Sequence, residues 1–175
     1  MRLQNIARCA LFSALLCICA WIGIPFGDGV VTLQTFALFL TLNLLGGKEG
    51  CLVCLVYLLL GAVGLPVFSG FRGGVGMLLG TTGGFLWGFF LGCLVFWGIT
   101  ALLGRGFLPR LFGCIFCCLT CYGCGCLWYV AVYVQTFPTL WTAVTACVLP
   151  YVIPDSIKLA LALFVSARLH RLIPA

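Results

Sequence analysis

GLPVFSGFRGGVGMLLGTTGGFLWGFFLG, residues 64–92, is the stretch that decides how this chain is organised. It holds ten glycines, one proline and the lone Arg72 between two strongly apolar segments. In a chain this hydrophobic, irregular backbone is tolerated only where protein buries it or where it lines a cavity. Glycine also lets the backbone approach a ligand closely. We therefore expect this stretch to form part of the wall of a binding site.

The composition on either side of this stretch indicates a membrane protein. Of the 175 residues, 64% are hydrophobic and 7% are charged, and the mean hydropathy is +1.28. A soluble domain carries roughly 25% charged residues. Long gaps without a charged residue separate the charges: 29–47, 50–71, 73–104 and 111–154. Because about 20 apolar residues cross a bilayer core, we predict an all-α integral membrane protein with six transmembrane helices, folded as a single transmembrane domain over residues 1–175.

The predicted helices cover residues 5–24, 32–45, 50–63, 81–103, 111–134 and 155–170, with a short helix over 139–149 near the outer face. We expect the first to be an uncleaved helix, although it resembles a signal peptide. Gly84, Gly88 and Gly92 in the fourth helix have the spacing that lets a neighbouring helix approach closely. The sixth has 16 residues, about 24 Å at 1.5 Å per residue. It is too short to span fully, so we expect Asp155 and Lys158 in its first turn, below the outer membrane boundary.

The net charge of +6 indicates topology rather than a nucleic-acid partner. With six crossings and a cytoplasmic N-terminus, seven of the nine basic residues fall at cytoplasmic helix ends: Arg2, Arg8, Lys48, Arg105, Arg110, Arg168 and Arg171. This bias follows the positive-inside rule and predicts that both termini are cytoplasmic. A nucleic-acid site would need clustered contacts to phosphates, and the pattern contains no such cluster.

Asp155 and Lys158 are the first candidate site residues. At positions i and i+3 they share one face of a helix, and ionisable groups at membrane depth are paired or functional. In a binding site, Asp155 would accept hydrogen bonds from ligand N–H groups, while Lys158 would donate to a carbonyl or carboxylate. Alternatively, the two residues form a self-neutralising pair that only makes the helix start tolerable.

Three polar residues near the predicted outer face are further candidates. Arg72 could clamp a ligand carboxylate through its guanidinium, or it could be a solvated loop arginine. Gln34 and Thr35, at the outer end of the second helix, could supply further hydrogen bonds, or they could have no contact with a ligand.

The thirteen cysteines favour packing over chemistry. Five of them, at positions 114, 117, 118, 121 and 124, follow helical periodicity and form a stripe. A thiol in such a helix behaves as a small apolar group, and no histidine or carboxylate lies nearby in the sequence to complete a metal site. One histidine and three acids also leave little material for acid–base catalysis. We expect no enzymatic activity, no cofactor and no metal.

Three blocks of sequence carry a resemblance to a known family: residues 64–89, residues 31–50 (VTLQTFALFLTLNLLGGKEG) and residues 149–162 (LPYVIPDSIKLALA). Their order and spacing resemble the BioY family, the biotin-binding S components of energy-coupling factor (ECF) transporters. One departure is Gly80-Thr81-Thr82-Gly83-Gly84, where the family usually has GPTGG. The resemblance implies the six-helix S-component bundle and a multi-pass protein of the bacterial cell (inner) membrane.

The same resemblance implies the function and the partners. Biotin would be held near the outer side, with Asp155 and Lys158 on polar ends of the ligand. Arg72 and the loop N–H groups at Gly73 and Gly74 would assist. A transmembrane coupling subunit and two ABC-type ATPases would supply the energy. The S components dock through an AxxxA pattern in the first helix, which here matches Ala10 and Ala14, residues that could instead pack within the bundle.

Three other functions stay open at this point. The chain could be a solitary biotin carrier without ATPase partners. It could be a membrane redox protein that uses the cysteine stripe. It could also be a structural membrane subunit without a ligand.

Overall fold

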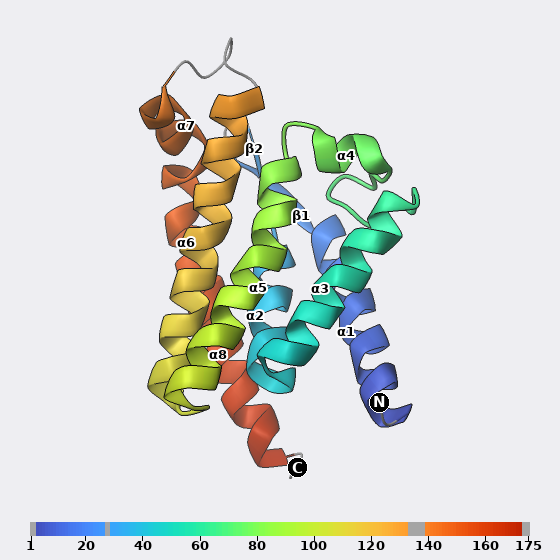
Figure 1. Ribbon diagram of the computed structural model, residues 1–175, viewed down its shortest axis with the longest axis vertical. Helices are drawn as coiled ribbons and strands as arrows, with labels where there is room; N and C mark the ends of the chain where they lie inside the picture. The colour runs from blue at the N-terminus through green and yellow to red at the C-terminus, as the bar shows by residue number, and fades with distance from the viewer. Residues whose placement is uncertain (1–2, 27–28, 133–138, 173–175) are drawn as a thin grey trace.

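A computed structural model of the chain describes residues 3–26, 29–132 and 139–172 (Figure 1). The described residues form eight helices and one two-stranded hairpin. In chain order the elements are α1 (Leu3–Trp21), β1 (Gly23–Phe26), β2 (Gly29–Thr32), α2 (Gln34–Leu45), α3 (Gly47–Ala62), α4 (Val75–Leu79), α5 (Gly83–Leu103), α6 (Phe107–Val132), α7 (Leu140–Cys147) and α8 (Leu149–Leu172). The predicted mostly helical fold is confirmed. The hairpin and α4 are additions that the sequence did not predict.

The short α2 is the centre of the bundle. Every residue from Ala37 to Asn43 is buried, because α1, α3 and α8 all pack against this helix. A helix without a polar face is stable only when neighbouring helices cover it on every side. The three helices around α2 provide that cover. Gly46, with a φ of +89°, ends α2 in a conformation that favours glycine, so α3 can begin at the next residue.

The most extensive helix contact is between α5 and α6. The three glycines of α5 with four-residue spacing lie against the backbone of α6: a Cβ atom at Gly88 would stand 2.8 Å from Cα of Cys121, and one at Gly92 2.7 Å from the carbonyl oxygen of Cys117. Side chains larger than hydrogen would therefore push the helices apart. The predicted close approach at this glycine spacing is confirmed.

This contact also explains the cysteine stripe. Cys114, Cys117 and Cys121 are buried on the inner face of α6, and Cys118 and Cys124 are half-buried. A small thiol fits where the partner helix offers glycine. The prediction that the stripe serves packing agrees with this position.

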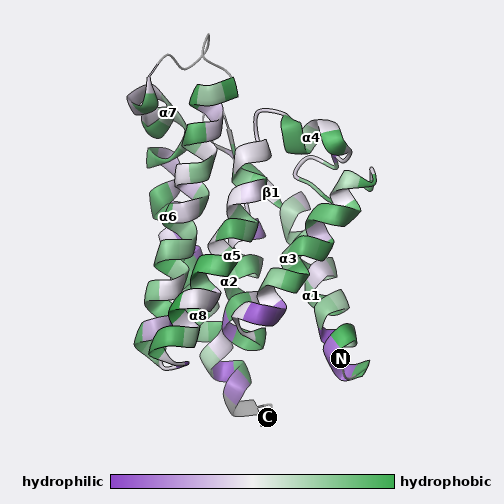
Figure 2. Cartoon of the chain, viewed as in Figure 1, coloured by the Kyte–Doolittle hydropathy of each residue, from purple (hydrophilic) through white to green (hydrophobic). Residues whose placement is uncertain are grey.

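The two ends of the molecule differ in composition (Figure 2). Figure 1 shows the two chain ends, the α2–α3 turn and the α5–α6 turn at one end, and the hairpin, α4 and α7 at the other. The hydrophilic colouring of Figure 2 gathers at the end with the termini. That end carries Arg8, Lys48, Arg105, Arg110 and Arg168. The orientation of this end toward the cytoplasm stays a prediction.

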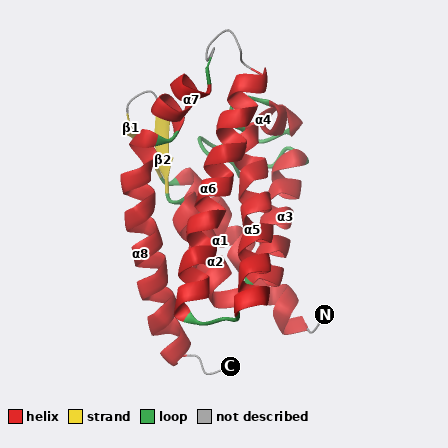
Figure 3. Cartoon of the chain, turned by 60° about the vertical axis from the view of Figure 1, so that its left-hand side comes forward, coloured by secondary structure: helices red, strands yellow, loops and turns green. Residues whose placement is uncertain are grey.

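The predicted start of the last helix is wrong. We expected a helix from Asp155, but α8 begins at Leu149 and continues through Pro154 for 24 residues, about 36 Å at 1.5 Å per residue. Pro154 removes only one backbone donor, and such a loss is tolerated in membrane helices. Asp155 and Lys158 therefore lie well inside a helix, and the free N–H groups of a helix N-terminus are not available to their site. The predicted short helix before it is confirmed as α7, which meets α8 at a bend of 47° (Figure 3).

By length and composition, three described helices can cross a membrane: α1, α5 and α6. The bent pair of α7 and α8 makes a fourth if it is counted as one span, and α2 is a shorter apolar helix. The count of six spans stays a prediction.

Candidate functional site

A polar cluster joins three helices in the interior of the bundle. Lys158 Nζ of α8 lies 2.7 Å from Asp155 Oδ1, and both side chains are buried, with 7% and 6% of each residue exposed. From α2, the hydroxyl of Thr35 donates to Asp155 Oδ1 at 2.8 Å and accepts from Lys158 Nζ at 3.2 Å. From α6, the hydroxyl of Tyr122 donates to Asp155 Oδ2 at 2.5 Å. We call these four residues the polar cluster.

The polar cluster is neutral and nearly closed. Both carboxylate oxygens of Asp155 accept hydrogen bonds, and two of the three ammonium donors of Lys158 are used. One N–H of Lys158 is left over. Asp155 and Lys158 form the ion pair that the sequence allowed, and whether they also hold a ligand stays a prediction.

A narrow cavity adjoins the polar cluster between α2, α5 and α6. Thr35 and Tyr122 line it together with Leu38, Phe39, Phe89, Cys117, Cys118 and Cys121. The surface that the cavity presents is apolar, because the hydroxyls of Thr35 and Tyr122 are bonded to Asp155. It has room for about one water molecule. A ligand larger than a few atoms would therefore have to widen the cavity to reach the polar cluster beside it.

Gln34 lies beside the polar cluster in sequence but takes part in a different contact. It is buried, and its Nε2 donates to the hydroxyl of Tyr57 in α3 at 3.0 Å. The ring of Tyr57 meets Phe68 edge-on, with centroids 5.4 Å apart. Gln34 therefore links α2 to the glycine-rich loop and not to Asp155.

The glycine-rich loop is folded and covers the ends of α1 and α3. Phe68 and Arg72 pair across a tight turn through backbone hydrogen bonds. Between them Phe71 has a φ of 57°, which is rare for a bulky residue. Its ring stacks on Trp21 with centroids 5.0 Å apart, and Trp21 Nε1 donates to the carbonyl of Pro66 at 2.7 Å.

The structure brings together only some of the predicted site residues. Thr35, Asp155 and Lys158 meet. The Arg72 side chain is exposed, and in the described part of the chain no carboxylate pairs with it. Gly73 lies tightly against the carbonyl oxygen of Leu65 and Gly74 donates to the carbonyl of Gly61 at 2.7 Å. The first contact lies within the loop, and the second holds the loop against α3.

Ala10 and Ala14 lie on the exposed face of α1. The opposite face is buried, and its Ser13 donates to the carbonyls of Cys9 at 2.8 Å and Val53 at 3.3 Å. The two alanines are therefore outside the bundle's own core in the single chain.

Sequence reasoning missed Tyr122 and Tyr57. A signal for Tyr122 was present, because it lies four residues after Cys118 and thus on the same helix face as part of the cysteine stripe. A phenol that shares the face of a buried stripe needs a hydrogen-bond partner. The sequence does not show that α8 provides that partner.

Comparison with known proteins confirms the family predicted from the three sequence blocks. A family model described as "BioY family" matches residues 1–175. The chain is 37% identical over 172 residues to "Biotin transporter BioY" of Thermotoga maritima, with 97% of this chain and 98% of the relative covered. It is 36% identical over 173 residues to "Probable biotin transporter BioY" of Pyrococcus horikoshii, with the same coverage.

The chain is similar in fold to the crystal structure of the S-component for biotin from an ECF-type ABC transporter. The TM-score is 0.86 at 24% identity, and the match covers 97% of this chain and 92% of that one. At this identity the likeness shows the fold alone.

Proposed function

The chain belongs to the BioY family, and from that membership we propose that it is the biotin-binding substrate-capture subunit of a membrane vitamin uptake transporter. The observation that carries the proposal is the match over nearly the whole length to proteins named as biotin transporters. BioY is a transporter family and not an enzyme class.

The polar cluster fits the chemistry of biotin's ureido ring. That ring offers two N–H donors and one carbonyl acceptor, and the cluster offers a carboxylate, an ammonium and two hydroxyls. Asp155 would accept from a ureido N–H, and Lys158 would donate to the ureido carbonyl, starting with its unused N–H. Hydrogen bonds from biotin would replace bonds that Asp155 already accepts from the hydroxyls of Thr35 and Tyr122. Each replacement would cost little free energy beyond the rotation of one hydroxyl.

Charge balance favours the ureido ring, and not the carboxylate, at the polar cluster. Asp155 and Lys158 cancel each other, so a ligand carboxylate beside them would leave one net negative charge in the membrane interior. Such a charge is costly, whereas the ureido ring is neutral. Arg72 carries a positive charge on the loop without a carboxylate partner among the described residues, and a guanidinium binds carboxylate well. We assign the valerate carboxylate to Arg72 and the N–H of Gly73, since the N–H of Gly74 already donates to the carbonyl of Gly61.

The apolar part of biotin would then occupy a widened form of the narrow cavity. Its walls are the rings of Phe39 and Phe89 and the thiols of α6. Gln34 would act indirectly in this arrangement, since it holds Tyr57 and, through that ring, Phe68 of the loop.

Transport would need partners. The sequence contains no GxxxxGK[ST] phosphate-binding loop, so ATP hydrolysis would come from two ABC-type ATPases through a transmembrane coupling subunit in the bacterial cell membrane. The exposed Ala10 and Ala14 would let a helix of that subunit approach α1 closely.

The experiment that tests the proposal is equilibrium binding of biotin to the purified chain in detergent, by titration calorimetry. Thiamine and riboflavin are the control ligands. We expect saturable binding of biotin and no binding of thiamine or riboflavin. No heat and no thermal stabilisation with biotin would refute it, and uptake with and without the ATPases would separate a coupled subunit from a solitary carrier.

A further inference from the structure

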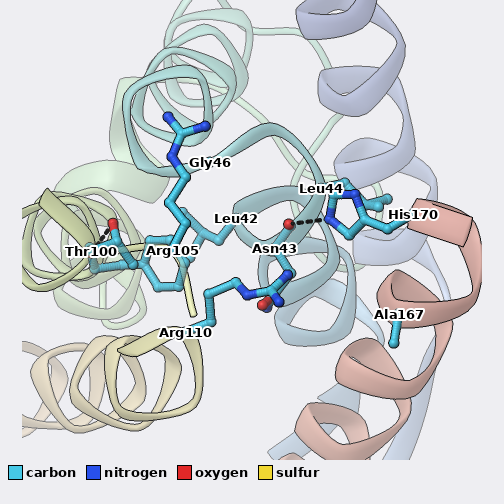
Figure 4. Close-up of a pocket in the computed structure, with 10 residues that line it drawn as sticks. Leu42, Asn43, Leu44, Gly46, Thr100, Arg105, Arg110, Ala167 and His170 are labelled. Carbon is cyan, nitrogen blue, oxygen red and sulfur yellow. Dashed lines mark hydrogen bonds between the residues drawn. The ribbon is translucent and has the colours of Figure 1, made fainter. Parts of the chain in front are cut away.

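A second cavity opens at the end of the molecule that carries the chain termini, away from the polar cluster (Figure 4). Its volume is about 390 Å³, within the range of small-ligand sites. Its lining comes from α2, the α2–α3 turn, α5, the α5–α6 turn, α6 and α8: Leu42, Asn43, Leu44, Gly46, Phe96, Thr100, Arg105, Arg110, Ala167 and His170. We call it the basic cavity.

The basic cavity holds two arginines and no carboxylate. In the described part of the chain the ion pair of Asp155 and Lys158 is the only one, so neither Arg105 nor Arg110 is neutralised within it. Arg110 uses Nε on the carbonyl of Gly106 at 3.3 Å, which leaves its terminal amino groups to a ligand. Two guanidinium groups at one cavity favour a phosphate, whose oxygens match their paired donors.

Asn43 lies in the wall of the same cavity. Only 4% of this residue is exposed, and its Nδ2 donates to the carbonyl of Phe39 at 2.8 Å and to Cys114 Sγ at 3.2 Å. His170 contacts the backbone oxygen of Asn43 at 3.1 Å. These contacts join α2 to α6 and α8 beside the two arginines.

The surroundings of the basic cavity indicate that this ligand is a lipid. Arg105 stands between four apolar residues that are strongly exposed in the chain, from 60% to 87%: Leu102, Leu103, Phe107 and Leu108. This apolar surface lies at the helix ends, where headgroups meet acyl chains. Basic groups at such a level bind anionic lipid headgroups.

We propose that the basic cavity binds the headgroup of an anionic phospholipid, such as phosphatidylglycerol. Arg105 and Arg110 hold the phosphate, and the acyl chains lie along the apolar residues of the α5–α6 turn. The bound lipid joins α2, α6 and α8 at one end of the bundle. The proposal is independent of the biotin site.

Native mass spectrometry of the delipidated protein tests this proposal with two lipids. Phosphatidylglycerol is expected to bind at least about tenfold more tightly than the zwitterionic phosphatidylcholine. Equal binding of the two lipids overturns the proposal. This comparison needs no variant.

Two double variants locate the site. Arg105→Gln with Arg110→Gln should weaken phosphatidylglycerol binding at least about tenfold. Arg8→Gln with Arg168→Gln removes the same charge at the same end of the molecule but outside the cavity, and it should leave phosphatidylglycerol binding nearly unchanged. An equal loss of affinity in the two double variants overturns the basic cavity as the binding site.

Soluble competitors separate the possible sources of the phosphate. Glycerol 1-phosphate and inorganic phosphate should fail to displace the lipid at equal concentration, and displacement by either identifies a soluble ligand and overturns the lipid. A further outcome is that the Arg105 and Arg110 variant loses uptake while the wild type shows no preference between the two lipids. That outcome assigns the two arginines to an acidic protein partner and also overturns the proposal.

Discussion

Replacing Lys158 with methionine removes the buried ammonium but keeps an unbranched side chain of similar length. In the ligand-free protein this breaks the 2.7 Å ion pair and leaves Asp155 with only the hydroxyls of Thr35 and Tyr122 as donors. Removing one partner of a buried pair typically costs about 3–5 kcal/mol. We expect a marked fall in thermal stability, so affinity has to be measured at a temperature where the variant is folded.

The loss of affinity follows from the hydrogen bond that Lys158 makes to biotin. A hydrogen bond to a charged group contributes about 1.5–3 kcal/mol, which corresponds to about a 10- to 150-fold weaker Kd. If Lys158 meets the ureido carbonyl, biotin and uncharged biotinamide should lose affinity by the same factor. A loss confined to biotin would instead place Lys158 at the carboxylate.

Titration calorimetry on the detergent-purified protein measures this effect, and the chain offers a matched control. Lys48 is the only other lysine and is exposed at the start of α3, so Lys48→Met should bind biotin as the wild type does. The double variant Asp155→Asn with Lys158→Met restores neutrality and should recover stability without recovering affinity. Wild-type affinity in folded Lys158→Met would refute the role of the ammonium.

Two further predictions concern helix contacts. Gly88→Leu should force α5 and α6 apart, costing about 1–3 kcal/mol or more because a Cβ atom there would already stand 2.8 Å from Cα of Cys121. Gly98 on the same helix faces open space, so Gly98→Leu should leave the thermal midpoint unchanged. If Gly88→Leu and Gly98→Leu unfold at the same midpoint, the proposed contact is contradicted. Ala10→Trp or Ala14→Trp should keep biotin binding but abolish ATP-dependent uptake in the complete transporter, and normal uptake would remove α1 as the docking face.

Helix contacts that depend on periodic spacing could be predicted from the sequence. The three glycines of α5 face α6 because a four-residue spacing keeps them on one side of any α-helix, whatever the fold. The start of α8 could not be predicted in the same way. Pro150 and Pro154 read as helix breaks, yet neighbouring helices hold the segment helical through both. α4 was missed because five residues among glycines carry no periodic signal.

For the candidate site, the sequence could predict only the contact between residues that are close in sequence. Asp155 and Lys158 are three residues apart, so their pairing follows from helix geometry alone. Thr35 and Tyr122 lie 120 and 33 residues away from Asp155 in sequence, and only tertiary packing brings them to it.

The placement of charge links the two ends of the molecule. Nine basic residues face only three acidic ones, Asp28, Glu49 and Asp155, so the chain cannot neutralise its own arginines. In the interior, where an unpaired charge is most costly, the one lysine has its own carboxylate. At the ends, where water and headgroups are within reach, Arg72, Arg105 and Arg110 have no such partner among the described residues. The described residues supply no counter-ion to these arginines, and we propose a ligand carboxylate at one end and lipid phosphates at the other.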